Sequence, residues 1–135
     1  MSKADIDDVA GAKAAFAKAL EFASHARPPQ ETYVSLAWLA FREDKLDDAI
    51  AWSQKGIDAN PVDSVGHVMM AIICARKGDT AKAKKAAVEA LRLEPEMRMA
   101  TSIVFPRPWP GKEAAYRKFM DTQFIPAWRL AGLPE

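Results

Sequence analysis

Apolar and small residues recur every three to four positions in two stretches of equal length, DDAIAWSQKGIDANP at residues 47–61 and AKAKKAAVEALRLEP at residues 81–95. This spacing places them on one face of a helix. Each stretch ends in proline, which has no N–H to donate and disfavours helical conformation in the residue before it. The pattern therefore predicts two amphipathic helices, each stopped by a proline.

The two stretches are related by a period of 34 residues, since Pro61 and Pro95 differ by 95 − 61 = 34. The same offset joins Ala37 to Ala71, Arg42 to Arg76, Ala49 to Ala83, Gly56 to Ala90 and Ile57 to Leu91. Small residues at helix contacts let two helices approach closely, where a bulky side chain would separate them. The sequence therefore predicts two repeats, at residues 30–63 and 64–97, each made of two antiparallel helices.

A 34-residue period in helical sequence resembles the tetratricopeptide repeat. Small residues at positions 8, 20 and 27 of each unit and proline at position 32 follow the pattern of that family. The chain departs from it at position 11, which holds Ala40 and Cys74, and at position 24, which holds Ser53 and Ala87. The resemblance implies an all-α fold in which residues 1–135 form a single solenoid of antiparallel helix hairpins.

Both flanks of the two repeats are expected to cap the stack, because fewer than about three such units bury too little surface alone. Residues 5–27 predict a leading helix, which ends before two consecutive prolines. Residues 98–135 begin an aborted third repeat, continue as a proline-rich linker and finish in a C-terminal capping helix.

Within the last segment, Phe119 and Phe124 lie on an apolar stripe at helical spacing, and Trp128 adds further apolar surface. Burial of each would contribute roughly 1.5–3 kcal/mol. Pro126 predicts a break or kink in this helix. These aromatic residues are expected to supply the burial that the missing third repeat does not.

The end of the chain carries a second resemblance. FPRPWPGKEAAYRKFMDTQFIPAWRLAGLPE, residues 105–135, looks like the C-terminal end of bacterial adenylate cyclases in which tetratricopeptide repeats follow the catalytic domain. The resemblance implies a regulatory or scaffolding module, cut from such a protein or standing beside one. It implies no cyclase activity, because residues assigned to helices leave none for a catalytic domain.

In the tetratricopeptide repeat family, the first helix of each unit lines a concave groove. The groove positions map here onto an apolar strip with an arginine at its edge in each unit. We call this set the contact strip; its members are Val34, Trp38, Phe41, Arg42, Met69, Ile72 and Arg76. Aromatic and Met side chains beside Arg suit a partner helix or an extended peptide. In a second arrangement, the C-terminal helix folds back and fills the strip itself.

Charge and hydropathy narrow the range of partners. The chain has 19 basic and 18 acidic residues, a net charge of +1, which gives no field to gather nucleic acid. The longest apolar run, residues 68–75, is far shorter than the roughly 20 residues of a membrane span. Asp5, Asp7 and Asp8 precede any apolar stretch, unlike a secretory signal, so a cytoplasmic location is expected.

No residue pattern predicts catalysis, a cofactor or a metal ion. His25 and His67 belong to no HExxH motif and no Cys/His cluster. Cys74 lies among apolar residues and is expected to be a buried small hydrophobe. PGK at residues 110–112 lacks the upstream glycine of a phosphate-binding loop, and EDKLDD at residues 43–48 is expected to be a solvated turn.

The sequence as a whole predicts a non-catalytic protein–protein interaction module, which binds a partner peptide or helix through the contact strip. Three alternatives stay open. The exposed end of an incomplete stack predicts self-association as a homodimer. The resemblance of the tail implies the regulatory C-terminal part of a nucleotide-cyclase-like signalling protein. An enzyme or small-ligand binder would use the space between the strip and the C-terminal helix.

Overall fold

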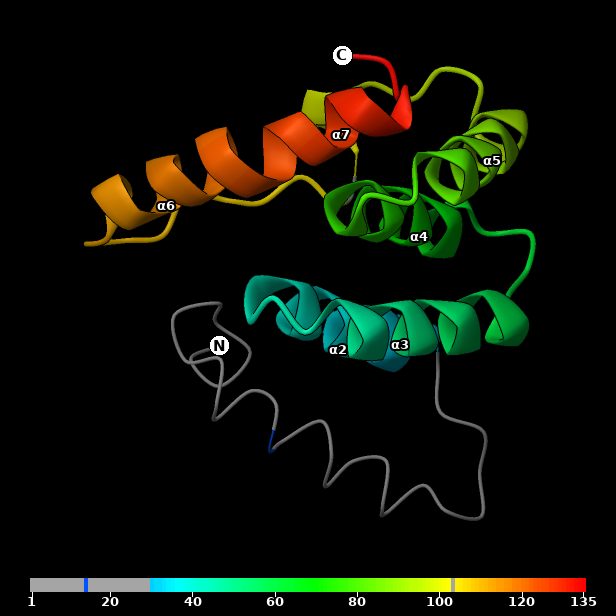
Figure 1. Ribbon diagram of the computed structural model, residues 1–135, viewed down its shortest axis with the longest axis horizontal. Helices are drawn as coiled ribbons and strands as arrows, with labels where there is room; N and C mark the ends of the chain where they lie inside the picture. Colours follow the sequence, from blue (N-terminus) through cyan, green and yellow to red (C-terminus); the bar gives the residue numbers. More distant parts are fainter. Residues whose placement is uncertain (1–13, 15–29, 103) are drawn as a thin grey trace.

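Two antiparallel helix hairpins form the body of the molecule (Figure 1). The first consists of α2 (Gln30–Arg42) and α3 (Leu46–Ala59), and the second of α4 (Ser64–Lys77) and α5 (Thr80–Leu93). This computed structural model describes residues 14, 30–102 and 104–135. No strand occurs within those residues, so the prediction of an all-α fold is confirmed for them. Apart from residue 14, the predicted leading helix lies outside the described residues.

The two hairpins stack on each other through α3 and α4, as a helix-hairpin solenoid requires. Small residues occupy the close contacts, and Ala49, Ala83 and Ala90 have no exposed surface (0% each). At Gly66, a Cβ atom would lie only 2.9 Å from Cγ1 of Ile57 on α3. The junction between the hairpins therefore depends on a glycine where α4 approaches α3.

The turns inside the two hairpins use a left-handed backbone at equivalent positions. Gly78 follows α4 with φ 96°, and Asp44 follows α2 with φ 60°. Glycine adopts this conformation freely, and Asp tolerates it better than most residues. The carboxylate of Asp44 also lies 3.4 Å from the guanidinium of Arg76. This ion pair links the turn of the first hairpin to the end of α4.

The chain after α5 lies outside the two hairpins. It forms one turn of 3-10 helix, η1 (Met99–Thr101), and then a proline-rich segment whose described residues, up to 112, have no helix. Next come α6 (Glu113–Phe119), a π-helical turn η2 (Met120–Phe124) and α7 (Ile125–Ala131), one directly after the other. We call residues 113–131 the C-terminal helix.

The C-terminal helix continues across Pro126, where the sequence predicts a break or kink. The backbone stays right-handed helical on the approach, with φ/ψ of −74°/−56° at Phe124 and −62°/−46° at Ile125. In the π-helical turn, the N–H of Ile125 donates to the carbonyl of Met120, five residues earlier. We attribute the continuity to this wider turn, since proline at this point lacks a donor and its ring crowds the preceding turn.

The last residues fold back onto the end of α7. Gly132 adopts φ 83°, and the N–H of Leu133 donates to the carbonyl of Trp128 at 3.3 Å, which is the reversal of a Schellman-type helix end. The carbonyl of Pro134 accepts two hydrogen bonds, from Nε1 of Trp128 at 2.8 Å and from the N–H of Met99 at 3.1 Å. The string WRLAGLPE therefore forms a structural closure of the helix.

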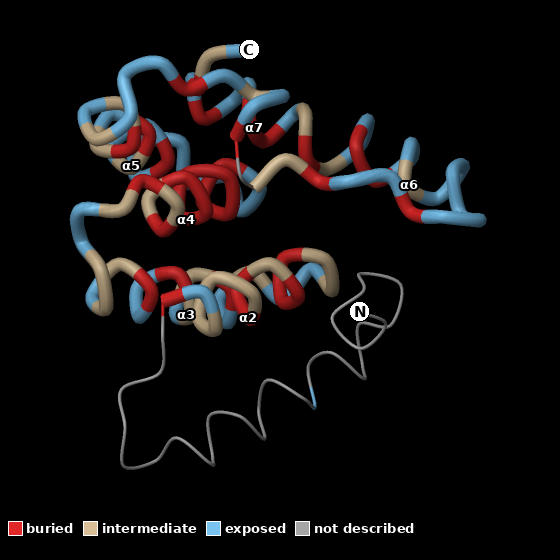
Figure 2. Tube along the Cα trace, turned by 180° about the vertical axis from the view of Figure 1, so that it is seen from behind, coloured by how far each residue is buried: buried red, intermediate tan, exposed pale blue. Residues whose placement is uncertain are grey.

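Among the described helices, α4 is buried along most of its length (Figure 2). The reason is that α2, α3, α5 and α7 all pack against it. Its buried residues are Ser64, Gly66, Val68, Met69, Met70, Ala71, Ile72, Ile73, Cys74 and Ala75. The core of the molecule is thus centred on α4, and any surface that includes α4 is shaped by the elements around it.

Candidate functional site

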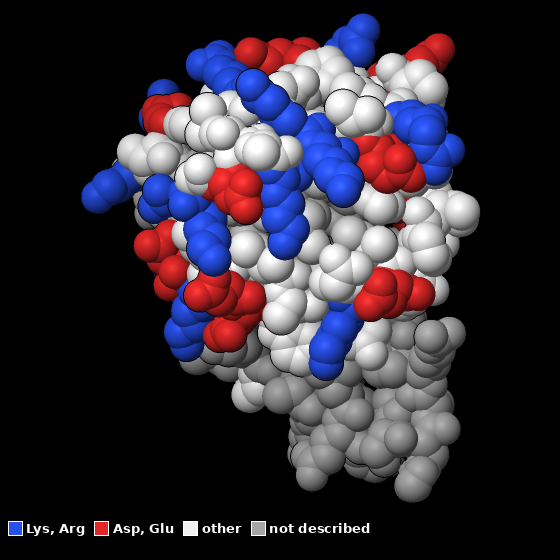
Figure 3. All heavy atoms as spheres, turned by 45° about the vertical axis from the view of Figure 1, so that its right-hand side comes forward, with Lys and Arg blue, Asp and Glu red and all other residues white. Residues whose placement is uncertain are grey.

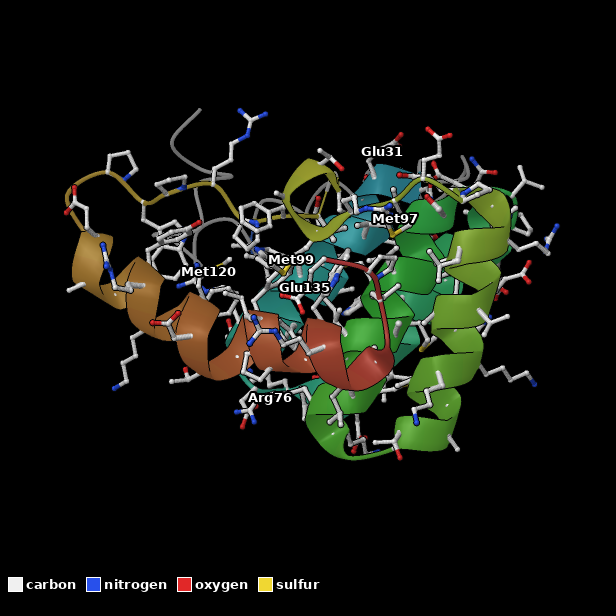
Figure 4. The ribbon with its side chains drawn as sticks, turned by 90° about the horizontal axis from the view of Figure 1, so that it is seen from above. Glu31, Arg76, Met97, Met99, Met120 and Glu135 are labelled. Carbon is white, nitrogen blue, oxygen red and sulfur yellow. The ribbon has the colours of Figure 1, made fainter. Side chains whose placement is uncertain are left out.

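The C-terminal helix covers the part of the contact strip that lies on α4. α7 packs against α4 and, less extensively, against α5, and Figure 4 shows the C-terminal helix crossing α2 and α4. Met69 and Ile72 are completely buried and belong to the same core cluster as Phe124 and Trp128. The apolar surface of α4 therefore faces protein instead of solvent.

Trp38 is the centre of the contacts between α2 and the C-terminal helix. Its ring centroid lies 5.7 Å from that of Phe119 and 6.0 Å from that of Phe124, and both pairs are edge-to-face. Phe41, one turn later on α2, lies 6.1 Å from Phe119 in the same geometry. Each such pair contributes about 0.5–1.5 kcal/mol beyond the burial of its area. The aromatic contacts therefore bind the C-terminal helix to the first hairpin.

Arg42, at the end of α2, lies over the ring of Trp109 in the proline-rich segment. Its guanidinium carbon is 3.8 Å from the centroid of that ring and 5.4 Å from the centroid of Phe119. The ring centroid of Tyr116 lies 5.6 Å from that of Trp109 in edge-to-face geometry, and the Tyr116 hydroxyl donates to the carbonyl of Pro106 at 2.9 Å. An arginine that the sequence places at the edge of a groove is thus stacked on an aromatic residue of its own chain.

The seven residues of the contact strip fall into distinct environments. Three are fully buried: Phe41, Met69 and Ile72. Two are half-buried and pack against the same core: Val34 and Trp38. Arg42 stacks on Trp109, whereas Arg76 is exposed at the margin of the molecule (Figure 4).

Of the two arrangements that the sequence leaves open, the structure contains the one in which the C-terminal helix fills the strip. An open apolar groove is absent from this arrangement of the described residues, because Phe119, Phe124 and Trp128 take up the space beside α2 and α4. The binding of a partner by the strip stays a prediction.

Two aromatic residues of the proline-rich segment belong to the site although sequence reasoning did not select them. Trp109 is 5% exposed and lies under Arg42, and Phe105 packs edge-on against Phe124 at 5.8 Å. The signal was their alternation with prolines in FPRPWP. Such a segment is extended and presents its side chains in fixed directions, so its aromatic residues can anchor it.

Among the described residues, the titratable groups near the site include a buried thiol and a histidine that contacts a turn. Burial raises the pKa of the Cys74 thiol, which keeps the thiol protonated near neutral pH. Nε2 of His67 lies 3.1 Å from the carbonyl oxygen of Pro61, a contact between α4 and the turn before it. Over the described part of the chain, no group of three or more His, Cys, Asp and Glu side chains is placed to hold a metal ion. None of the described helices is long and apolar enough to cross a membrane.

The second hairpin, with the short turn that follows it, is the part of the chain that a known family describes. Residues 66–97 match the tetratricopeptide repeat. The match covers nearly the whole second repeat expected from the 34-residue period, and it supports a tetratricopeptide-type protein and an interaction module in general. No curated protein and no solved structure matches the chain. The resemblance of the tail to adenylate cyclases therefore stays a prediction.

Proposed function

We propose that this protein is a non-catalytic protein–protein interaction module whose contact strip binds an amphipathic helix of a partner. The C-terminal helix is then the resident occupant of the strip, and the partner helix displaces it. The observation that carries the proposal is the set of edge-to-face contacts that Trp38 makes with Phe119 and Phe124. These contacts join two segments far apart in the sequence.

The resident helix indicates what kind of ligand the strip accepts. It is amphipathic: Phe119, Phe124 and Trp128 are buried, whereas Lys118 and Arg129 on the same helix are exposed. Amphipathic helices are a common class of ligand for apolar grooves, and they are read through a few aromatic or aliphatic anchors. A partner helix with similarly spaced aromatic residues would reproduce the present contacts.

Occupation by the C-terminal helix controls the affinity for such a partner. The apparent dissociation constant rises in inverse proportion to the fraction of molecules in which the strip is vacant. Weakening the C-terminal helix should therefore tighten the binding of a competitor, although the strip itself is unchanged. A surface unrelated to the C-terminal helix would show no such effect.

A labelled peptide of residues 113–135 is a defined probe for this competition. Its binding to the full chain is measured by fluorescence anisotropy, for the wild type and for Phe119→Ala. Phe119 is 6% exposed and touches Trp38, Phe41 and Trp109 through its ring. We expect Phe119→Ala to bind the peptide at least about tenfold more tightly than the wild type.

Two controls make the result specific. Lys118→Ala changes an exposed neighbour of Phe119 and should bind the peptide as the wild type does. A peptide with alanine in place of its three anchoring aromatic residues should not bind any variant. If the Phe119→Ala variant keeps its helix content but does not bind the unmodified peptide, the strip is not a helix-binding surface. Replacing Trp38 or Arg42 is less informative, because both residues contact the C-terminal helix and its linker.

A further inference from the structure

The outer faces of α3 and α5 carry opposite charges at equivalent positions of the repeat. Asp48 corresponds to Lys82, Lys55 to Glu89, and Asp58 to Arg92, each pair 34 residues apart. Positions separated by seven and by three residues lie on one face of a helix. The two second helices of the repeats therefore present complementary charge patterns to their surroundings.

The charge difference extends to the whole hairpins. Residues 30–63 contain 3 basic and 7 acidic residues, a net charge of −4, whereas residues 64–97 contain 6 basic and 4 acidic residues, a net charge of +2. Figure 3 shows Lys and Arg side chains gathered on the upper part of one face of the molecule. The two hairpins differ in sign and together carry a net charge of −2, and residues 98–135, with 6 basic and 3 acidic residues, bring the chain to +1.

Within the described residues, no ion pair joins a charged residue of α3 to one of α5. Asp58 accepts a hydrogen bond from Gln54 on its own helix, Lys55 lies 5.1 Å from the ring centroid of Trp52, and Glu89 pairs with Arg92. α4 packs on both α3 and α5 and lies between them. Asp48 and Lys82 are exposed and form no ion pair within the described part of the chain.

The exposed apolar residues on these faces are few but well placed for a contact. Val88 is 68% exposed, and it lies on α5 between Lys85 and Arg92, with Ala81 two turns before it. The equivalent face of α3 offers Ala51 and Gln54. Weak protein–protein interfaces often have a small apolar centre surrounded by charged residues, and complementary charges on the two sides determine which partners bind.

We propose that α3 of one molecule docks on α5 of a second copy of this chain. The second copy is the occupant that the charges favour, because α3 supplies acidic residues at the repeat positions where α5 is basic, and a basic residue where α5 is acidic. The ion pair within α5, between Glu89 and Arg92, is exposed and weak, so it exchanges for an intermolecular pair at little cost. The association is electrostatic and therefore weakens as salt is added.

The outer faces of α3 and α5 are distinct from the end of the helix stack. An incomplete solenoid would be expected to associate with a second copy through that end. On α3, the side that meets the next hairpin carries Ile50, which packs against the core. The equivalent residue of α5 is Lys84, which is exposed. A lysine at the stacking position disfavours the addition of another hairpin there.

Sedimentation velocity of the full chain tests the proposal at about 10 mM and about 0.5 M ionic strength, where screening lengths differ severalfold. We expect self-association at protein concentrations up to about 0.5 mM, at least about tenfold weaker in high salt. Two variants invert the charges on one helix each: Asp48→Lys with Asp58→Lys on α3, and Lys82→Glu with Arg92→Glu on α5. Each variant alone should be monomeric, because its two faces then carry the same sign.

Mixing provides the decisive measurement. The α3 variant has two basic faces and the α5 variant two acidic ones, so an equimolar mixture should associate although neither does alone. The chain with all four changes should associate as the wild type does. The matched control is the double variant Lys112→Glu with Lys118→Glu. Lys112 lies just before α6 and Lys118 lies on it, so association should be unchanged. A monomeric wild type in low salt overturns the proposal, as does association that survives the single-helix inversions.

Discussion

Arg42 of α2 lies over the ring of Trp109, with its guanidinium carbon 3.8 Å from the ring centroid. Nε1 of Trp109 is buried and has no hydrogen-bond partner among the described residues. The indole is therefore held by contacts to its ring, from Arg42 on one side and from Tyr116 and Phe119. This contact fixes the proline-rich segment against the first hairpin.

Replacing Arg42 should loosen that segment. We expect Arg42→Ala to lower the free energy of unfolding by about 1–2 kcal/mol, because a stacked cation and its aliphatic stem are both lost. Arg42→Lys should recover only part of this, since an ammonium group lacks the planar surface that stacks on an indole. Urea unfolding measures the effect. Arg117→Ala, at an exposed position of α6, is the control, and an equal loss in both variants would contradict a special role for Arg42.

Trp128 should be the most sensitive residue of the C-terminal helix. It is 0% exposed, and Trp128→Ala should cost about 3–5 kcal/mol of stability. Trp128→Phe removes the hydrogen bond to the carbonyl of Pro134, but that carbonyl keeps the N–H of Met99 as a donor. The loss from Trp128→Phe should therefore be nearer 1–2 kcal/mol. Thermal unfolding of both variants is the measurement. If Trp128→Phe were as unstable as Trp128→Ala, the ring packing would not account for most of the loss.

Two glycines should respond to alanine with opposite signs. At Gly56, the nearest atom to an added Cβ is 3.5 Å away, which is ordinary contact, and the second repeat has Ala90 at this place. Gly56→Ala should raise the free energy of unfolding by up to about 1 kcal/mol through helix propensity. At Gly66, the Cβ would meet the side chain of Ile57 at 2.9 Å and its backbone nitrogen at 3.3 Å.

For Gly66→Ala, we therefore expect a net loss of about 1–3 kcal/mol, because the stacked hairpins must separate to admit the methyl group. Gly66→Ala should cost less in the background of Ile57→Ala than in the wild type, since Cγ1 of Ile57, the nearest obstacle, is then removed. Chemical unfolding of the three variants decides the matter. A stabilising Gly66→Ala would mean that α3 and α4 approach less closely than the structure shows.

The pKa of Cys74 predicts how stability changes at alkaline pH. Burial raises this pKa above its ordinary value of 9.0, so the thiol stays protonated in the folded state when the unfolded chain has begun to ionise. The contribution is fully present below pH 9 and is lost as pH rises above it, with a slope of at most about 1.4 kcal/mol per pH unit. Unfolding of Cys74→Ala between pH 7.5 and 10.5 should show a shallower decline than the wild type. Parallel curves would exclude Cys74 as the cause.

The repeat and its helices were predictable because they depend on local periodicity. Ala49 and Ala83 mark helix contacts in the sequence, and both are completely buried in the structure. The start of α5 obeys the same kind of local rule, because the carboxylate of Asp79 accepts the N–H of Lys82. Local rules were sufficient for the two hairpins.

The site was less predictable because its contacts join distant segments. Nothing near Trp38 in the sequence indicates that Phe119 and Phe124 will cover it. The continuity of the helix across Pro126 depends on a π-helical turn, which has no clear sequence signal. The sequence left two arrangements open, one with the contact strip free for a partner and one with the C-terminal helix in the strip. Local sequence patterns could not decide between them.

The junction between the hairpins sets the order in which they stack. Duplicating the first hairpin in tandem would place Thr32, which stands 34 residues before Gly66, against Ile57, where even a methyl group is crowded. Duplicating the second would put Lys84 where Ile50 meets its neighbour. Neither hairpin can therefore follow itself at the same spacing, so the side chains at the junction fix the order of the two hairpins.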